Sequence, residues 1–477
     1  MPVSGDAVTE ARVPPKLWMR ATGGAIVVGS GAALALMAPT HGLALSLFFL
    51  AALAVLNLDA AHRAPALLGA TAALGLYFST GIGSIDLPAV VPISAGLLVI
   101  TVLRRETVVP KLPWDLRAPV AVFLGGLILG MVRGPAPRAG VRVLIILGWL
   151  VLVGWLSMVL SLQRREGALF RAYAAVAAGF GLVNVFFFLF PRAEDAYFAS
   201  WISQVFVEPD SIRKLLTGDV LNNALSDLKA ATVYINANVA AMFYGTAAWV
   251  AYGWWHGSRV RWLLTGACAL GALGTVSRGG ALGCAASLLV WGLLQVRRGA
   301  FGRSALRIMA GVVLLSIVGA ALAEVRSESL SRFAWSTVSA DPRFVLWGVA
   351  LSLGQSHPLI GSGFGAWESY WPGIARVVDL RPSFPPHNVY LYLWIIGGIV
   401  APLAFLWIAL SMLRAARQVA LRTGEHAPEA LAAGAMVGWC WMQANFENFF
   451  FLDYRIGFML AVTFGWLTAR RAVAAAK

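Results

Sequence analysis

The segment Val143–Leu162 reads VLIILGWLVLVGWLSMVLSL and carries no charged side chain. As a helix it is roughly 30 Å long, which matches the hydrocarbon thickness of a bilayer. Hydrocarbon offers no hydrogen-bond partner to an exposed backbone, so a long apolar segment of this kind crosses it as a helix. Comparable apolar runs recur along the chain at Ala25–Ala38, Ala172–Phe190 and Ser304–Ala323. The sequence therefore predicts a chain that crosses a membrane repeatedly.

The composition indicates the same solvent. Of 477 residues, 59% are hydrophobic and 12% are charged, and the mean hydropathy is +0.75. A soluble domain carries about twice as much charge. We expect an all-α polytopic membrane protein, a single integral domain of residues 1–477 with about 12–14 transmembrane helices. The candidate helices are centred near Val28, Leu50, Ala72, Gly96, Gly126, Val151, Gly179, Met242, Leu270, Leu288, Val313, Val400, Gly438 and Val462.

The formal net charge of +15 comes from arginine and lysine in short clusters between apolar runs. This arrangement indicates membrane topology rather than nucleic-acid binding, because positively charged short loops stay in the cytoplasm. We interpret residues 1–20 as a cytoplasmic tail and not as a cleaved signal peptide. With this orientation, the positive-inside rule assigns eight basic clusters to the cytoplasmic side. They lie around Arg12, Arg63, Arg104, Arg164, Arg259, Arg297, Arg417 and Arg470. One short basic loop violates it by falling outside, the loop that contains Arg133, Arg138 and Arg142.

Two long stretches, 191–231 and 324–387, lack a membrane-length apolar run and fall outside. Long loops of a compact protein are usually functional or disordered. The second stretch is rich in tryptophan and phenylalanine, which disordered linkers lack. We expect this large outer loop to form short helices that cap an outward-facing cavity.

The three cysteines, Cys268, Cys284 and Cys440, lie inside apolar runs and have no C-x-x-C spacing. Small side chains of this kind in apolar helices usually fill the core. We therefore expect neither a disulfide framework nor a metal site.

Four patterns fall at the outer ends of the predicted helices. They are Ser277-Arg278-Gly279-Gly280, Asp341-Pro342-Arg343-Phe344-Val345-Leu346-Trp347, the glycine run Gly361, Gly363 and Gly365, and Pro385-Pro386-His387-Asn388-Val389-Tyr390. An arginine at a membrane boundary is costly unless it snorkels or pairs with an anion. Arg278 also lies on the side that the positive-inside rule disfavours. Both observations favour a functional role for this arginine.

These patterns, in this order, resemble the O-antigen ligase and polymerase superfamily of bacterial envelope enzymes. Members carry an S-R-G turn, a D-x-R segment, a glycine-rich turn and an H-N segment that opens a helix. The resemblance covers roughly Tyr234–Gly398 and includes Asn236-Ala237-Asn238, which is similar to an N-x-N pair of the family. It implies a bundle of the GT-C type in the bacterial inner membrane, with its active site facing the periplasm.

The resemblance implies transfer of a glycan from undecaprenyl pyrophosphate to an acceptor. Arg278 and Arg343 match the family's donor-binding arginines, and the planar guanidinium suits phosphate oxygens. His387 matches the family's histidine, and an imidazole can accept the acceptor's hydroxyl proton near neutral pH. A direct attack by that hydroxyl inverts the anomeric centre. We expect no cofactor and no metal ion, because two arginines can neutralise the leaving group.

Further residues of the same region are candidate substrate contacts. Arg376 and Arg381 are possible additional phosphate contacts, and the resemblance adds Asn238 and Asn388. Each assignment has a simpler alternative, since Arg343 can pair with Asp341 or Glu368 and a lone histidine often only bonds at the interface. The three glycines are expected to shape a turn. We place Glu447, Asp453 and Arg455 outside the site, as a structural ion-pair group.

The acceptor separates the alternatives within the superfamily. A ligase transfers the glycan to lipid A–core, whereas a polymerase extends the glycan itself, and the motifs are compatible with both. We favour the ligase and retain the polymerase; a protein O-oligosaccharyltransferase is less well supported. A lipid-linked oligosaccharide flippase or transporter predicts internal repeats or helices broken within the membrane. Neither feature is evident in the sequence.

Overall fold

The computed structural model describes residues 60–79, 86–103, 113–207, 229–296, 341–422, 424, 426–448 and 450–476, together with 211, 212, 215 and 217. The tail 1–20, the candidate helices centred at Val28, Leu50 and Val313, and residues 324–340 of the second loop lie outside the described residues.

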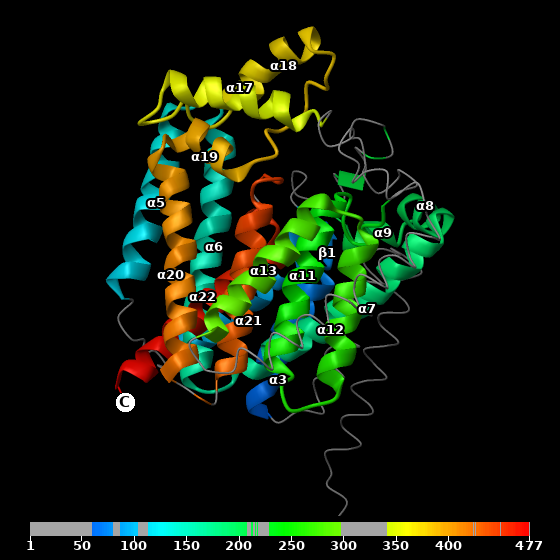
Figure 1. Ribbon diagram of the computed structural model, residues 1–477, viewed down its shortest axis with the longest axis vertical. Helices are drawn as coiled ribbons and strands as arrows, with labels where there is room; N and C mark the ends of the chain where they lie inside the picture. Colours follow the sequence, from blue (N-terminus) through cyan, green and yellow to red (C-terminus); the bar gives the residue numbers. More distant parts are fainter. Residues whose placement is uncertain are drawn as a thin grey trace, which may run out of the picture.

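The described chain is a bundle of α-helices with one small β-ribbon (Figure 1). The bundle helices are α3 (Ala60–Leu74), α4 (Val90–Leu103), α5 (Trp114–Arg133), α6 (Pro137–Leu162), α7 (Glu166–Leu189), α11 (Ala237–Trp254), α12 (Val260–Gly274), α13 (Arg278–Val296), α20 (Val400–Arg422), α21 (Ala427–Gln443) and α22 (Tyr454–Ala476). The shorter ones are α8 (Pro191–Ala199), α9 (Ser203–Phe206), α17 (Arg343–Ser356), α18 (Ala366–Val377), α19 (Val389–Gly397) and the 3-10 turn η2 (Phe450–Leu452). The ribbon pairs β1 (Tyr77–Ser79) antiparallel with β2 (Asp86–Pro88).

The lengths of the helices fit a membrane protein. Within the described residues, α5, α6, α7 and α20 are long and apolar enough to cross a bilayer by length and composition. They carry many large apolar side chains on their outer surfaces, such as Ile145 on α6, which is 66% exposed. Exposed apolar surface on long helices is what contact with lipid requires. The expected all-α polytopic membrane fold is confirmed.

The helices pack closely where their side chains are small. α6 and α22 lie side by side, and a Cβ atom on Gly465 would lie 2.0 Å from the carbonyl oxygen of Gly154. Helices in lipid gain little by shielding apolar side chains from water, so close backbone packing becomes a main source of association. Gly465 permits this close approach of the α6 and α22 backbones.

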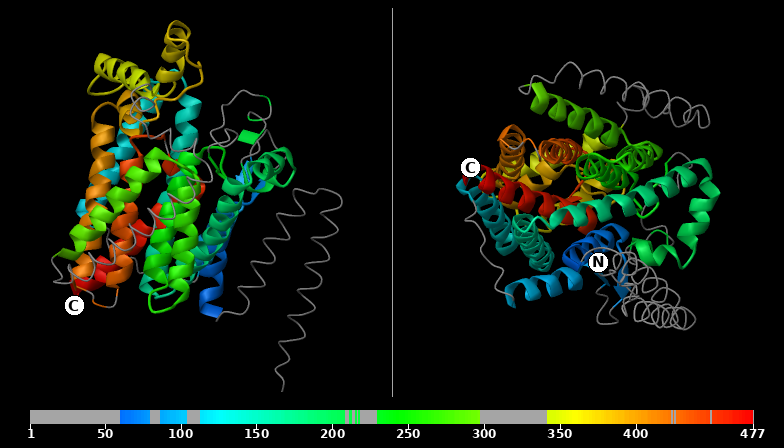
Figure 2. Two further views of the ribbon diagram at one scale, coloured as in Figure 1. Left: turned by 45° about the vertical axis from the view of Figure 1, so that its right-hand side comes forward. Right: turned by 90° about the horizontal axis from the view of Figure 1, so that it is seen from below.

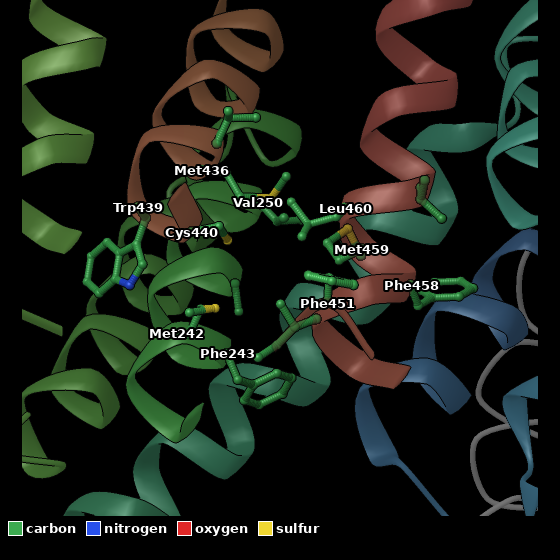
Figure 3. Close-up of a cluster of buried hydrophobic side chains, with 14 of the residues drawn as sticks. Met242, Phe243, Val250, Met436, Trp439, Cys440, Phe451, Phe458, Met459 and Leu460 are labelled. Carbon is green, nitrogen blue, oxygen red and sulfur yellow. The ribbon is translucent and has the colours of Figure 1, made fainter. Parts of the chain in front are cut away.

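The centre of the bundle is filled by side chains of α11, α21 and α22 (Figure 3). Met242 and Phe243 come from α11, Met436 and Cys440 from α21, and Met459 from α22. All three cysteines are free thiols, and Cys268 and Cys440 are fully buried. The expectation that they are core residues is confirmed for these two, while Cys284 is only partly buried.

Ion pairs identify one end of the bundle, which we call the basic end. Arg471 on α22 pairs with Asp115 at the start of α5 at 2.6 Å, and Arg470 pairs with Glu166 at the start of α7. The connection between α11 and α12 lies at the same end, where Trp255 donates to the carbonyl oxygen of Arg171. The clusters around Arg164, Arg259 and Arg470, all predicted to share one side, therefore do so.

The opposite end is covered by α17 and α18, which lie across the tops of α5, α19 and α20 (Figures 1 and 2); we call it the capped end. The rings of Trp367 and Trp371 stack at 5.3 Å and lie in a small core with Leu346 of α17 and Ile395 of α19. From residue 341 onward, the second loop therefore folds into short packed helices, as expected.

A glycine-rich turn fixes α18 to the bundle. Gly361, Gly363 and Gly365 all have positive φ angles, of 68°, 89° and 86°. A Cβ atom on Gly363 would lie 2.3 Å from the Cα atom of Gly134 in the turn between α5 and α6. The backbone groups of Phe364 bond to Gly130 and Ala136 in the same place. The loop that contains Arg133 and Arg138 thus lies at the capped end, on the side where the topology placed it.

The candidate helix centred at Val400 is not one helix, which corrects the sequence-based expectation. It is broken at Gly398, with φ 67°, into α19 and α20. Tyr390 on α19 and Phe405 on α20 both lie against Trp441, with their own rings 5.9 Å apart, so the chain reverses between them. The apolar run hides this reversal, and only Gly397-Gly398 marks it in the sequence. α19 therefore begins inside the bundle and ends at the capped end.

We predict that the capped and basic ends face opposite sides of the membrane. In a background without Cys268, Cys284 and Cys440, cysteine at Val377 on α18, which is 84% exposed, and cysteine at the exposed Arg422 of α20 should react with an impermeant thiol reagent from opposite sides. Labelling is measured on intact and on permeabilised cells. Equal labelling of both positions from outside would contradict this topology.

Candidate active site

The site begins with two asparagines at the start of α11. The side chain of Asn236 accepts the N–H of Asn238 at 2.9 Å, so Asn236 caps this helix. Asn238 is 4% exposed, and its amide oxygen accepts the hydroxyl of Ser277 at 2.7 Å. Gln443 of α21 donates to the backbone carbonyl of Asn238. These bonds tie the N-x-N segment to the S-R-G segment and to α21.

Ser277 prepares the start of α13. Its hydroxyl oxygen accepts the N–H of Gly280 at 3.0 Å. A Cβ atom at Gly280 would lie 2.8 Å from the Cβ of Ala241, so α13 starts directly against α11. The next residue, Arg278, is the first of α13, and its side chain remains 29% exposed.

One carboxylate joins the two predicted arginines. Oδ2 of Asp341 lies 2.5 Å from Nη2 of Arg278 and 3.3 Å from Nη1 of Arg343. Oδ1 of the same side chain accepts the N–H of Arg343, the first residue of α17. The pairing with Asp341 foreseen as an alternative for Arg343 is therefore present, but the same carboxylate also holds Arg278. Two cations and one anion leave this cluster with a net positive charge.

His387 lies beside this cluster in a strained conformation. Its φ angle is 51°, and its ring lies 6.2 Å from that of Phe384. Burial and the positive charge of Arg343 lower the pKa of His387 to about 4, while Asp341 acts weakly in the opposite direction. The imidazole is therefore neutral near pH 7. Its Nδ1 is buried and has no partner among the described residues, so it is available to a ligand.

Three residues with positive φ lie in or next to the motif segments. Thr232, Val276 and His387 have φ angles of 55°, 46° and 51°. For β-branched residues such as threonine and valine this conformation is unfavourable, and such strain is concentrated at functional sites. The strain occurs just before the N-x-N and S-R-G segments and within H-N.

Four helices start around the arginine pair: α11, α13, α17 and α19. Asn388 caps the last of them, because its side chain accepts the N–H of Leu391 at 3.1 Å. The N-terminal end of a helix carries a partial positive charge, which favours anions. Four such ends and two guanidinium groups make this part of the capped end suited to a polyanion.

The structure does not assign a substrate contact to the other predicted binding residues. Asn238 and Asn388 use their side-chain oxygens to position Ser277 and α19, so their role as ligands stays a prediction. Arg376 is exposed on α18, and Arg381 follows that helix with its carbonyl bonded to Trp371. Neither forms an ion pair within the described part of the chain, and their phosphate contacts stay predictions.

Of the expected ion-pair group at Glu447, Asp453 and Arg455, the structure shows only an electrostatic attraction between Asp453 and Arg455. Within the described residues these three form no salt bridge with one another. Arg455 is 1% exposed and donates to the carbonyl oxygens of Leu74, Gly75 and Phe206. The side chain of Asp453 caps α22, and Glu447 instead accepts a hydrogen bond from Asn236 at 3.0 Å.

These features define a helical membrane protein with a cationic site at one end. Residues 262–406 match the sequence model of the family described as O-antigen ligase. The matched range contains Arg278, Arg343 and His387, and it supports the resemblance to the O-antigen ligase and polymerase superfamily. The match supports glycan transfer of the ligase or polymerase type. No curated protein matches the chain.

We predict that His387 is a neutral base down to acidic pH. A lowered pKa keeps the proton-accepting form populated, so kcat/KM should stay flat across neutral pH and fall on a limb centred near pH 4. His387→Ala should lower the rate by about 10²–10⁴-fold and remove the limb. Removal of the exposed His357 should leave the profile unchanged. Rates of transfer measured from pH 3.5 to 8 test this, and a limb near pH 6.5 would contradict it.

Proposed function

We propose that the protein transfers a glycan from undecaprenyl pyrophosphate to lipid A–core at the periplasmic face of the bacterial inner membrane, as an O-antigen ligase. The observation that carries the proposal is the pair of guanidinium groups, from α13 and α17, that share Asp341 beside a neutral histidine. The basic end would face the cytoplasm, in agreement with the positive-inside rule.

The arginines would bind the donor's pyrophosphate. Each guanidinium presents several N–H groups in a planar fork, and phosphate oxygens accept them in pairs. Asp341 holds both forks together before the donor arrives, so little reorganisation is required on binding. As the bond to the sugar breaks, negative charge grows on the pyrophosphate, and fixed cations stabilise that charge.

His387 would activate the acceptor. The acceptor's hydroxyl proton passes to the imidazole while its oxygen bonds to the anomeric carbon of the donor sugar. The bond from that carbon to the pyrophosphate oxygen breaks, and its electron pair leaves with undecaprenyl pyrophosphate. A single displacement inverts the anomeric centre. The arginines do the charge neutralisation that a divalent cation performs in other transferases, so the reaction is proposed to need no metal ion or cofactor.

The donor's lipid tail would lie among the helices. A cavity of about 360 Å³ lies between α5, α6, α20 and α22, with an apolar lining that includes Phe405, Trp441 and Phe451. Tyr390, three residues after His387, contacts Phe405. The cavity therefore starts close to the proposed site of transfer, and its lining suits isoprenoid units.

The polymerase remains the alternative, since it uses the same donor chemistry with a glycan as acceptor. Purified protein supplied with a lipid-linked glycan and either lipid A–core or a second lipid-linked repeat distinguishes the two. Product on lipid A–core alone supports the ligase, and elongated lipid-linked glycan alone supports the polymerase. A flippase would give no covalent product with either acceptor.

We predict that Arg278→Ala and Arg343→Ala each abolish transfer, because each removes one fork from the pyrophosphate. Lysine at either position should restore only part of the rate, since a point charge loses the paired geometry. Transfer is measured with purified donor, and expression and insertion are checked by membrane fractionation. Arg376→Ala, on the exposed face of α18, is the comparison variant. Wild-type rates in both alanine variants would reject the donor site.

We also predict that transfer persists in excess EDTA. Among the described residues, no three histidine, cysteine, aspartate or glutamate side chains form a group that could hold a metal ion, and Asp341 already binds two arginines. Transfer is followed with and without EDTA, and then with added Mg²⁺. Loss in EDTA with recovery on adding Mg²⁺ would replace the two-arginine mechanism by a metal-dependent one.

A further inference from the structure

Glu447 is a buried carboxylate with one free oxygen. It lies between α21 and η2, and it is 3% exposed. Oε2 accepts the side-chain N–H of Asn236, whereas Oε1 is buried without a hydrogen-bond partner among the described residues. Burial raises the pKa of Glu447, and the charges of Arg343 and Lys229 and the side-chain amides of Asn238 and Asn236 oppose that rise. The carboxyl group is therefore close enough to Arg343 to interact with it.

The segment that carries Glu447 packs between the two arginine helices. The Cβ atom of Phe446 lies 3.3 Å from the position that a Cβ atom on Gly279 would occupy, one residue after Arg278. The ring of Phe446 lies 6.1 Å from that of Trp347, one helical turn after Arg343 on α17. Glu447 thus belongs to the wall of the arginine cluster, although it lies far from it in sequence.

Other polar atoms of this wall are also buried without partners. Within the described residues they are Nε of Arg343, Nε1 of Trp347, Nδ1 of His387 and Oδ1 of Asn448. A single buried polar atom without a partner is destabilising, and native proteins contain few of them. Of the fourteen such atoms among the described residues, five belong to Glu447 and to these four residues, and a ligand bound here would complete their hydrogen bonds.

The chemistry of these atoms identifies the kind of ligand. The indole and guanidinium N–H groups donate, while the carboxylate and amide oxygens accept. A second phosphate group would be repelled by the carboxylate, and an apolar chain would leave all of these atoms unpaired. Sugar hydroxyl groups both donate and accept, and the rings of Trp347 and Phe446 offer apolar faces beside them.

We propose that Glu447 binds a sugar hydroxyl group through Oε1 and is a specificity-determining residue of the transfer reaction. The inference rests on the proposed glycan transfer and adds a hydroxyl-binding wall beside the pyrophosphate site, with Trp347 supplying a donor. The hydroxyl belongs either to the first sugar of the donor or to the acceptor.

Glu447→Gln tests this, because the amide keeps the size of the side chain and can still accept from Asn236, but it places an N–H₂ group at the free position. We expect kcat/KM to fall by about 10- to 100-fold, the range for a hydrogen bond to a charged group. A rise in the KM of the donor alone assigns the hydroxyl to the donor sugar, and a rise for the acceptor alone assigns it to the acceptor. Substrates that each lack one hydroxyl group identify the hydroxyl that Glu447 binds. With the wild type, the substrate without that hydroxyl should react more slowly than the complete substrate. With Glu447→Gln, the two substrates should react at the same rate.

Glu429→Gln is the matched control. Glu429 is also buried and also has one free oxygen, but it lies at the start of α21, near His256, at the basic end. This variant should keep both KM values. Binding of undecaprenyl pyrophosphate, which has no sugar, should be equal in the wild type and in Glu447→Gln.

The outcomes separate the two proposals. If undecaprenyl pyrophosphate binds neither protein, the proposed function fails. If it binds both, and Glu447→Gln keeps wild-type KM values and wild-type discrimination among the deoxy substrates, the role of Glu447 is rejected. If Glu447→Gln does not fold, Trp347→Phe replaces it, since phenylalanine keeps the ring and removes the N–H group. Unchanged discrimination in that variant would overturn the inference as well.

Discussion

The first N–H groups of every helix lack partners within that helix, and hydrocarbon supplies none. In this protein short polar side chains meet this need at four helices that start near the candidate site, whereas α5, α6, α7, α12 and α21 have no side-chain cap. Asn236, Ser277 and Asn388 bond the early N–H groups of α11, α13 and α19, and Asp341 does so for α17. These caps are the polar residues of the motifs themselves. The residues that make the helices possible in lipid are thus also the ones that collect four positive helix ends around one site.

The electrostatics of the site follow from that arrangement. Helix ends and two arginines concentrate positive charge where water is scarce, and a single carboxylate balances only part of it. Asp341 can therefore hold the guanidinium groups in place without cancelling their attraction for a doubly anionic group. The same positive field, with burial, keeps His387 neutral. The proposed anion site and the proposed neutral base are therefore compatible, because burial and the charge of Arg343 both keep His387 unprotonated.

Much of the fold could be predicted from hydropathy alone. Every candidate centre within the described residues falls inside a helix, because long apolar runs have few alternatives in lipid. The reversal at Gly398 was missed, since both halves of that run are equally apolar. The resemblance located Arg278, Arg343 and His387, and the structure brings them together. It could not indicate that Asp341 bridges the arginines, or that Glu447 lies beside them, because both facts depend on contacts between distant helices. The available signal was the pair of acidic residues Glu447 and Asp453 close to Arg455 in the sequence, and it was interpreted as an ion-pair group.

The candidate site includes residues that lie outside the sequence range matched by the family model. Residues 262–406 contain both arginines and the histidine, to which we assign the binding of a pyrophosphate and the transfer of a proton as a proposal. Asn236 and Glu447, which face them, lie on either side of that range and are bonded to each other at 3.0 Å. Under the proposed function, the groups that bind the pyrophosphate and take up the proton come from the matched segment, while Asn236 and Glu447 come from outside it. Such a division would let one displacement reaction serve different glycans, because the groups that distinguish one sugar from another could change without disturbing the arginine pair.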